Sequence, residues 1–127
     1  MERAAGRCEY CLSPAEYVPD PLVVEHIIPR SRGGSHRLSN LALSCHGCNG
    51  YKYTSVEAVD PFSGEPAPLY NPRRHMWREH FVWSEDSAHL LGLTPTGRAT
   101  IARLDLNRPS VVNLRALLRM VGKHPPE

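Results

Sequence analysis

The sequence lacks any long apolar run, and this absence excludes membrane-spanning and typical secreted proteins. The first seven residues, Met1–Arg7, contain no apolar segment of signal-peptide length, and no later segment is long enough to span a bilayer. We therefore expect a cytoplasmic protein with no membrane partner. Disulfides are uncommon in that reducing compartment, where cysteines more often bind metal.

A strong excess of charge is also missing, because the net charge is only +2. The overall balance thus indicates a polyanionic partner only weakly, but the arginines are grouped. Arg30 and Arg32 stand beside Gly33-Gly34, and Arg73 and Arg74 follow a proline. Such groups suit phosphate contacts, although they could equally be solvated faces of loops and helices.

The length of 127 residues, of which 41% are hydrophobic, predicts one soluble domain, residues 1–127, with a single core. Apolar and β-branched runs, helix caps and prolines predict an α+β fold, in which strands 22–28 and 41–44 precede a short helix near Cys45. The expected parts are a functional core (1–53), an extended connector (54–72), an extension (73–122) with a C-terminal β-hairpin (81–84 and 89–93) and two helices (95–104 and 109–122), and a disordered tail (123–127).

All four cysteines fall into two C-x-x-C pairs, Cys8/Cys11 and Cys45/Cys48. Each short loop can present both sulfurs to one side, and four thiolates make a closed tetrahedral zinc site. A redox motif would not explain a second pair, and His46 is an alternative ligand that four sulfurs make unnecessary. A zinc ion with four protein ligands has no open position, so we expect a structural zinc and chemistry elsewhere.

Between and beside the cysteine pairs stand Glu25-His26, Asn40 and Asn49, with 14 positions from His26 to Asn40 and 9 from Asn40 to Asn49. With the cysteines, this pattern over residues 8–53 resembles the HNH endonuclease family. The resemblance implies a small zinc-stapled ββα-metal (His-Me finger) core. It also implies that Glu25 and Asn49 bind a catalytic Mg²⁺ or Mn²⁺ ion, and that Asn40 bridges backbone groups and orients His26.

The chemistry of these residue types is consistent with phosphodiester hydrolysis. A neutral imidazole, here His26, can accept a proton from water near pH 7. Oxygen ligands suit Mg²⁺ and Mn²⁺, and Asn49 favours these ions over softer metals. Neighbouring residues on an ideal strand point to opposite faces, so Glu25 would reach an ion beside His26 only from a distorted strand.

The sequence therefore predicts a metal-dependent HNH endonuclease that hydrolyses phosphodiester bonds in DNA, with RNA left open as a substrate, and that acts as a monomer or a homodimer. The side chains expected to contact nucleic acid are Arg30, Arg32, Lys52 and Arg73. Two alternatives are a catalytically inactive zinc-stapled nucleic-acid-binding module and a zinc-dependent protein-interaction module. The acid-histidine pair and Asn49 favour the nuclease, because neither alternative needs them.

Overall fold

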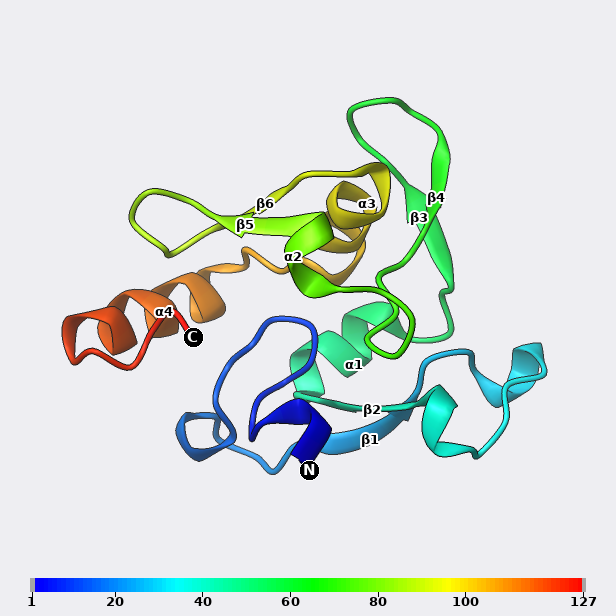
Figure 1. The fold of residues 1–127 in the computed structure, drawn as a ribbon, viewed down its shortest axis with the longest axis horizontal. Helices are drawn as coiled ribbons and strands as arrows, with labels where there is room; N and C mark the ends of the chain where they lie inside the picture. Colours follow the sequence, from blue (N-terminus) through cyan, green and yellow to red (C-terminus); the bar gives the residue numbers. More distant parts are fainter. Residues whose placement is uncertain (1, 127) are drawn as a thin grey trace.

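A two-stranded antiparallel sheet and a short helix form the part of the protein that contains both cysteine pairs. The computed structural model describes residues 2–126. Strand β1 (Val23–His26) pairs with β2 (Leu41–Ser44), and helix α1 (His46–Lys52) follows directly and lies beside the sheet (Figure 1). These elements lie where the sequence predicts them. Helix α1 begins where the Cys45 sulfur accepts a hydrogen bond from the N–H of Cys48.

The loop between the two strands contains two 3₁₀ turns, η3 (Arg30–Arg32) and η4 (Leu38–Asn40). Two other 3₁₀ turns, η1 (Glu2–Ala4) and η2 (Ala15–Tyr17), lie nearer the N-terminus. Gly34 packs so closely on Ile28 that a Cβ at this position would overlap the Ile28 carbonyl oxygen. A glycine at position 34 thus lets the loop fold back onto the end of β1.

The expected connector contains a β-hairpin of strands β3 (Glu57–Val59) and β4 (Pro66–Pro68). The Asp60 carboxylate accepts a hydrogen bond from the N–H of Phe62 at 3.0 Å within the connecting turn. It also forms an ion pair with Arg98 at 2.9 Å. The prolines of β4 are tolerated because every second N–H of a two-stranded sheet points away from the partner. The proline-rich composition thus excludes a helix here but not paired strands.

The C-terminal half contains the remaining five elements (Figure 1): α2 (Trp77–His80), β5 (Phe81–Trp83), β6 (Leu90–Gly92), α3 (Pro95–Leu104) and α4 (Pro109–Met120). Strands β5 and β6 pair antiparallel. The Thr94 hydroxyl accepts the N–H of Gly97 at 3.0 Å, and Pro95 stands at the first helical position, so α3 begins where its sequence predicts.

The spacing of apolar residues over 109–122 predicts a helix face of Val112, Leu114, Leu117, Leu118 and Val121, but the buried face of α4 differs from it. Leu117 and Val121 are exposed, whereas Arg115 is buried beside the predicted Leu118. Burial of Arg115 is possible because its guanidinium donates to the carbonyls of Ala88 at 3.0 Å and Cys11 at 3.3 Å. An apolar pattern cannot indicate such partners, which lie far away in the sequence.

The prediction of a disordered tail is wrong for residues 123–126, and residue 127 lies outside the described residues. His124 is buried, and its Nε2 donates to the Ser87 carbonyl at 2.7 Å. Its ring also packs edge-on against Trp83, with 4.5 Å between ring centroids. Composition alone does not show that one buried ring can anchor a short polar tail.

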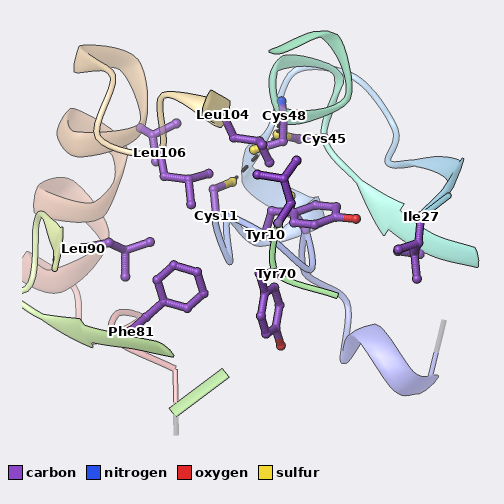
Figure 2. Close-up of a cluster of buried hydrophobic side chains, with 14 residues drawn as sticks. Tyr10, Cys11, Ile27, Cys45, Cys48, Tyr70, Phe81, Leu90, Leu104 and Leu106 are labelled. Carbon is purple, nitrogen blue, oxygen red and sulfur yellow. Dashed lines mark hydrogen bonds between the residues drawn. The ribbon is translucent and has the colours of Figure 1, made fainter. Parts of the chain in front are cut away.

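One buried cluster joins the cysteine-bearing segment to the C-terminal elements. Figure 2 shows the cysteine sulfurs beside Leu104, with Tyr10 close by, while Phe81 and Leu90 approach from the β5–β6 hairpin. Residues far apart in the sequence therefore share one core, in an architecture of small sheets and short helices. No helix within residues 2–126 has the length and apolar character needed to cross a membrane.

Candidate functional site

The four cysteine sulfurs converge in the buried core. All four lie within 4.8 Å of one another, and the sulfurs of Cys11 and Cys45 are 3.8 Å apart. Four sulfurs at about 2.3 Å from a tetrahedral zinc ion would stand about 3.8 Å from each other. The cysteines are unpaired by disulfides, and this soft, closed donor set fits a structural zinc ion.

Local structure positions each cysteine pair. Cys8 and Cys11 lie in a tight turn in which the N–H of Leu12 bonds to the Cys8 carbonyl at 3.0 Å. Cys45 caps α1, and Cys48 lies one turn into the helix. The cysteine site therefore fastens the N-terminal turn to the start of α1.

Arg108, which precedes α4, lies against two of the sulfurs. Its guanidinium nitrogens stand 3.5 Å from Cys45 Sγ and 3.7 Å from Cys48 Sγ, and the guanidinium also lies over the Tyr51 ring at 5.5 Å. Burial lowers the pKa of Arg108, but the neighbouring sulfurs of Cys48, Cys11 and Cys45 together more than offset this effect, so the pKa lies above its usual value. A cation at this position compensates the negative charge of a metal-thiolate cluster.

His26, the predicted base, ends β1 with its side chain half-buried. Its Nε2 lies 2.8 Å from Nδ1 of His36, which stands in the loop between the strands. Sequence reasoning missed His36 because a histidine in an irregular loop carries no periodic signal. Its only signal is its position in the loop, ten residues beyond His26.

Asn40, at the end of η4, holds the two ends of the same loop together. Its Oδ1 accepts the N–H of Ile28 at 2.9 Å, and its Nδ2 donates to the carbonyls of Ile28 at 3.0 Å and Ser35 at 2.8 Å. Ile28 lies two residues beyond His26, and Ser35 directly precedes His36. The Asn40 amide thus holds the backbone beside both histidines.

Glu25 lies on the opposite face of β1 from His26. It is only 4% exposed, and its carboxylate accepts bonds from the Tyr10 hydroxyl and, at 3.1 Å, from Lys52 Nζ. The strand keeps the regular alternation of side chains, as its register with β2 shows. The structure therefore does not bring Glu25 together with His26, as the expected ligand role requires.

The predicted nucleic-acid contacts divide into exposed and buried side chains. Arg30 and Arg32 are exposed in η3, where Arg32 Nε donates to the Thr54 carbonyl at 2.7 Å. Lys52 is 1% exposed, so the prediction that it contacts nucleic acid is wrong. Arg73 is largely buried in an ion pair with Glu9, and this pair leaves it poorly placed for an external phosphate.

Asn49, the second expected metal ligand, lies on the exposed surface of α1, next to the buried Cys48. The buried positions of α1 are taken by Cys48 and Lys52. Thus α1 directs its cysteine and lysine inward and leaves the Asn49 amide accessible.

Comparison with known proteins finds a family similarity for this segment. A family model described as HNH endonuclease matches residues 8–55. Neither the curated proteins nor the solved structures contain a significant match to the chain. The matched residues include both cysteine pairs, the two strands and α1. The segment that holds the cysteine site, His26, Asn40 and Asn49 therefore is similar to the HNH endonuclease family.

Proposed function

We propose that this protein is a metal-dependent HNH endonuclease that hydrolyses phosphodiester bonds in DNA, with His26 as the general base. The observation that carries the proposal is the His26–His36 contact of 2.8 Å in a loop held by Asn40, within the segment that matches the family. We further propose that β1, β2 and α1 form a ββα-metal core and that a zinc ion on the four cysteines stabilises it.

The imidazole pair determines which nitrogen of His26 is free to act. If Nε2–H of His26 donates to Nδ1 of His36, Nδ1 of His26 keeps its lone pair. That lone pair accepts the proton of a water molecule as the water oxygen bonds to phosphorus. The bond from phosphorus to the 3′ oxygen then breaks, and solvent protonates the leaving oxygen. His36 stabilises the imidazolium that forms on His26, and Asn40 holds the backbone beside both rings.

The residues present fit a catalytic Mg²⁺ or Mn²⁺ ion only in part. Asn49 offers an accessible amide oxygen on α1, whereas both oxygens of Glu25 are engaged by Tyr10 and Lys52. Glu25 could act as a ligand only by leaving Lys52 as an unpaired buried cation, which is costly. Glu25 is therefore not among the proposed metal ligands.

Cleavage of supercoiled plasmid tests this function. The zinc-loaded protein is incubated with plasmid and Mg²⁺ or Mn²⁺, and nicked and linear products are separated on a gel. We expect wild-type protein to cut, and His26→Ala to cut at least about 100-fold more slowly, because general-base catalysis contributes about 10²–10⁴-fold. The matched control is His89→Ala, which removes an exposed histidine of the β5–β6 hairpin.

Equal cutting by His26→Ala and wild type would refute the assignment of the base. A folded, zinc-loaded wild type that binds DNA but does not cut it with either ion would favour the inactive nucleic-acid-binding module instead. Parallel reactions on single-stranded DNA and RNA define the substrate.

A further inference from the structure

A cavity of about 770 Å³ lies between the N-terminal segment and the α2–β5 region, and Ser39 of the loop between β1 and β2 also lines it. Its lining includes four arginines and two tryptophans: Arg3, Arg7, Arg73, Arg78, Trp77 and Trp83. The HNH family match covers residues 8–55, so both tryptophans and all four of these arginines lie outside it.

The charges at the cavity favour an anion. Four arginines line it, against one carboxylate, Glu9, which pairs with Arg73. Burial and the positive charge of Arg3 both lower the pKa of Arg73, so the like charges oppose each other across the site. The Arg78 side chain is exposed, and its guanidinium has no hydrogen-bond or ion-pair partner within residues 2–126. A bound phosphate would offset this excess positive charge.

The same cavity offers aromatic surface and unused hydrogen-bond donors. The rings of Trp77 and Trp83 have centroids 5.5 Å apart, inclined at 39°. Trp77 Nε1 and Arg73 Nε are buried and have no acceptor among the described residues. Buried donors of proteins are usually satisfied, so these two groups indicate that water or a ligand completes the site.

The cavity adjoins the sheet face that carries His26. Arg3 and Glu9 also line a smaller depression formed with Val24 and Leu41. Val24 and His26 share one face of β1 because residues two apart on a strand point the same way, and Leu41 pairs with His26 across the sheet. The cavity and the depression on this face of the sheet therefore adjoin at Arg3 and Glu9.

We propose that this cavity binds one unpaired nucleotide of the nucleic acid that the protein cuts, an inference that rests on the proposed nuclease function. The base contacts Trp77 and Trp83, and Arg3 and Arg78 bind its flanking phosphates. A nucleotide combines the anionic and aromatic character that the lining favours. The base must be unpaired because both faces of a paired base are already stacked within the duplex.

Tryptophan fluorescence tests this proposal directly, because Trp77 and Trp83 are the only tryptophans of the chain. Zinc-loaded protein is titrated, without added divalent ions so that no cutting occurs, with octathymidylate and separately with an eight-base-pair duplex. We expect octathymidylate to quench the emission to saturation and to bind at least about fivefold more tightly than the duplex. Inorganic phosphate at the same concentration should leave the emission unchanged.

Two matched variants test the location of the site. Arg78→Glu reverses an exposed charge at the cavity, and Arg103→Glu reverses an exposed charge on α3 that does not line it. We expect Arg78→Glu to weaken octathymidylate binding about tenfold and to lower the salt dependence by about one phosphate contact. Arg103→Glu should bind within about twofold of wild type. Circular dichroism checks that both variants are folded.

The absence of quenching, equal binding of the duplex, or equal effects of the two charge reversals would each overturn the proposal. Its failure is separable from failure of the nuclease function, because plasmid cutting is measured independently. A protein that cuts plasmid without quenching overturns the cavity proposal alone. A protein that shows the expected quenching and variant effects but never cuts supports the cavity proposal and overturns the nuclease.

Discussion

Replacing Lys52 with methionine should greatly lower the free energy of unfolding relative to wild type, although Lys52 is a charged residue on a short helix. The side chain is 1% exposed, and its Nζ donates to Glu25 Oε2 at 3.1 Å and to the Ile27 carbonyl at 2.9 Å. Methionine keeps the apolar stem but leaves the Glu25 carboxylate buried with only Tyr10 as donor. Breaking a buried ion pair by removing one partner costs about 3–5 kcal/mol.

That cost is large relative to the free energy of unfolding of a small domain, about 5–15 kcal/mol. We expect urea denaturation of the zinc-loaded protein at pH 7 to show a loss of about 3–5 kcal/mol for Lys52→Met. The double variant Glu25→Gln/Lys52→Met should lose less than the sum of the two single variants, with a coupling energy of about 1–3 kcal/mol. Arg103→Met, an exposed control on α3, should stay within about 0.5 kcal/mol of wild type.

The same variants distinguish two roles for Glu25, as the ion-pair partner of Lys52 or as a ligand of the catalytic metal. If the ion pair is its role, Glu25→Gln lowers stability and leaves the Mg²⁺ concentration for half-maximal cutting within about twofold of wild type. A loss below about 1 kcal/mol for Lys52→Met, or a tenfold higher Mg²⁺ requirement for Glu25→Gln, would refute the reasoning.

Three further predictions concern other parts of the molecule. His36→Ala should lower kcat for plasmid cutting about tenfold with little change in KM. His36→Asn, whose amide can accept the same hydrogen bond from His26, should restore part of the lost kcat. An unchanged kcat in His36→Ala would contradict a role for the His26–His36 contact. Metal analysis should find one zinc per chain, and Cys48→Ser should lose it and melt at a lower temperature; a zinc-free, equally stable wild type contradicts the site. Burial lowers the pKa of His124, so stability should fall as pH decreases from about 6.5 through that lowered value, and His124→Gln should show a shallower fall in thermal melts; an equal slope would exclude His124 as its source.

Local patterns predicted the parts of the fold that depend on neighbouring residues. Strands β1 and β2, the Thr94-Pro95 start of α3 and the convergence of the C-x-x-C pairs follow from short-range geometry. The alternation of side chains along β1 likewise indicated that Glu25 and His26 face opposite ways, and the structure shows this arrangement.

The missed features depend on contacts between distant segments. The burial of Lys52 requires Glu25 on another element, and that of Arg115 requires carbonyls from two separate loops. His36 reaches His26 only through the irregular path of the intervening loop. In each case the residue type alone predicts an exposed side chain without a specific partner. A residue far away in the sequence supplies that partner in the folded protein.

Arg108 lies outside the family match yet contacts the cysteine sulfurs. The residues that match the family model are therefore not a unit that folds cooperatively by itself. A fragment cut at residues 8–55 would keep every cysteine but lose the Arg108 donors, together with Phe81, Leu90 and Leu104 from the shared core (Figure 2). Zinc affinity and docking of the C-terminal half are then linked equilibria, each strengthening the other by the same free energy. Limited proteolysis of the zinc-loaded chain should accordingly yield no stable product that ends near residue 55.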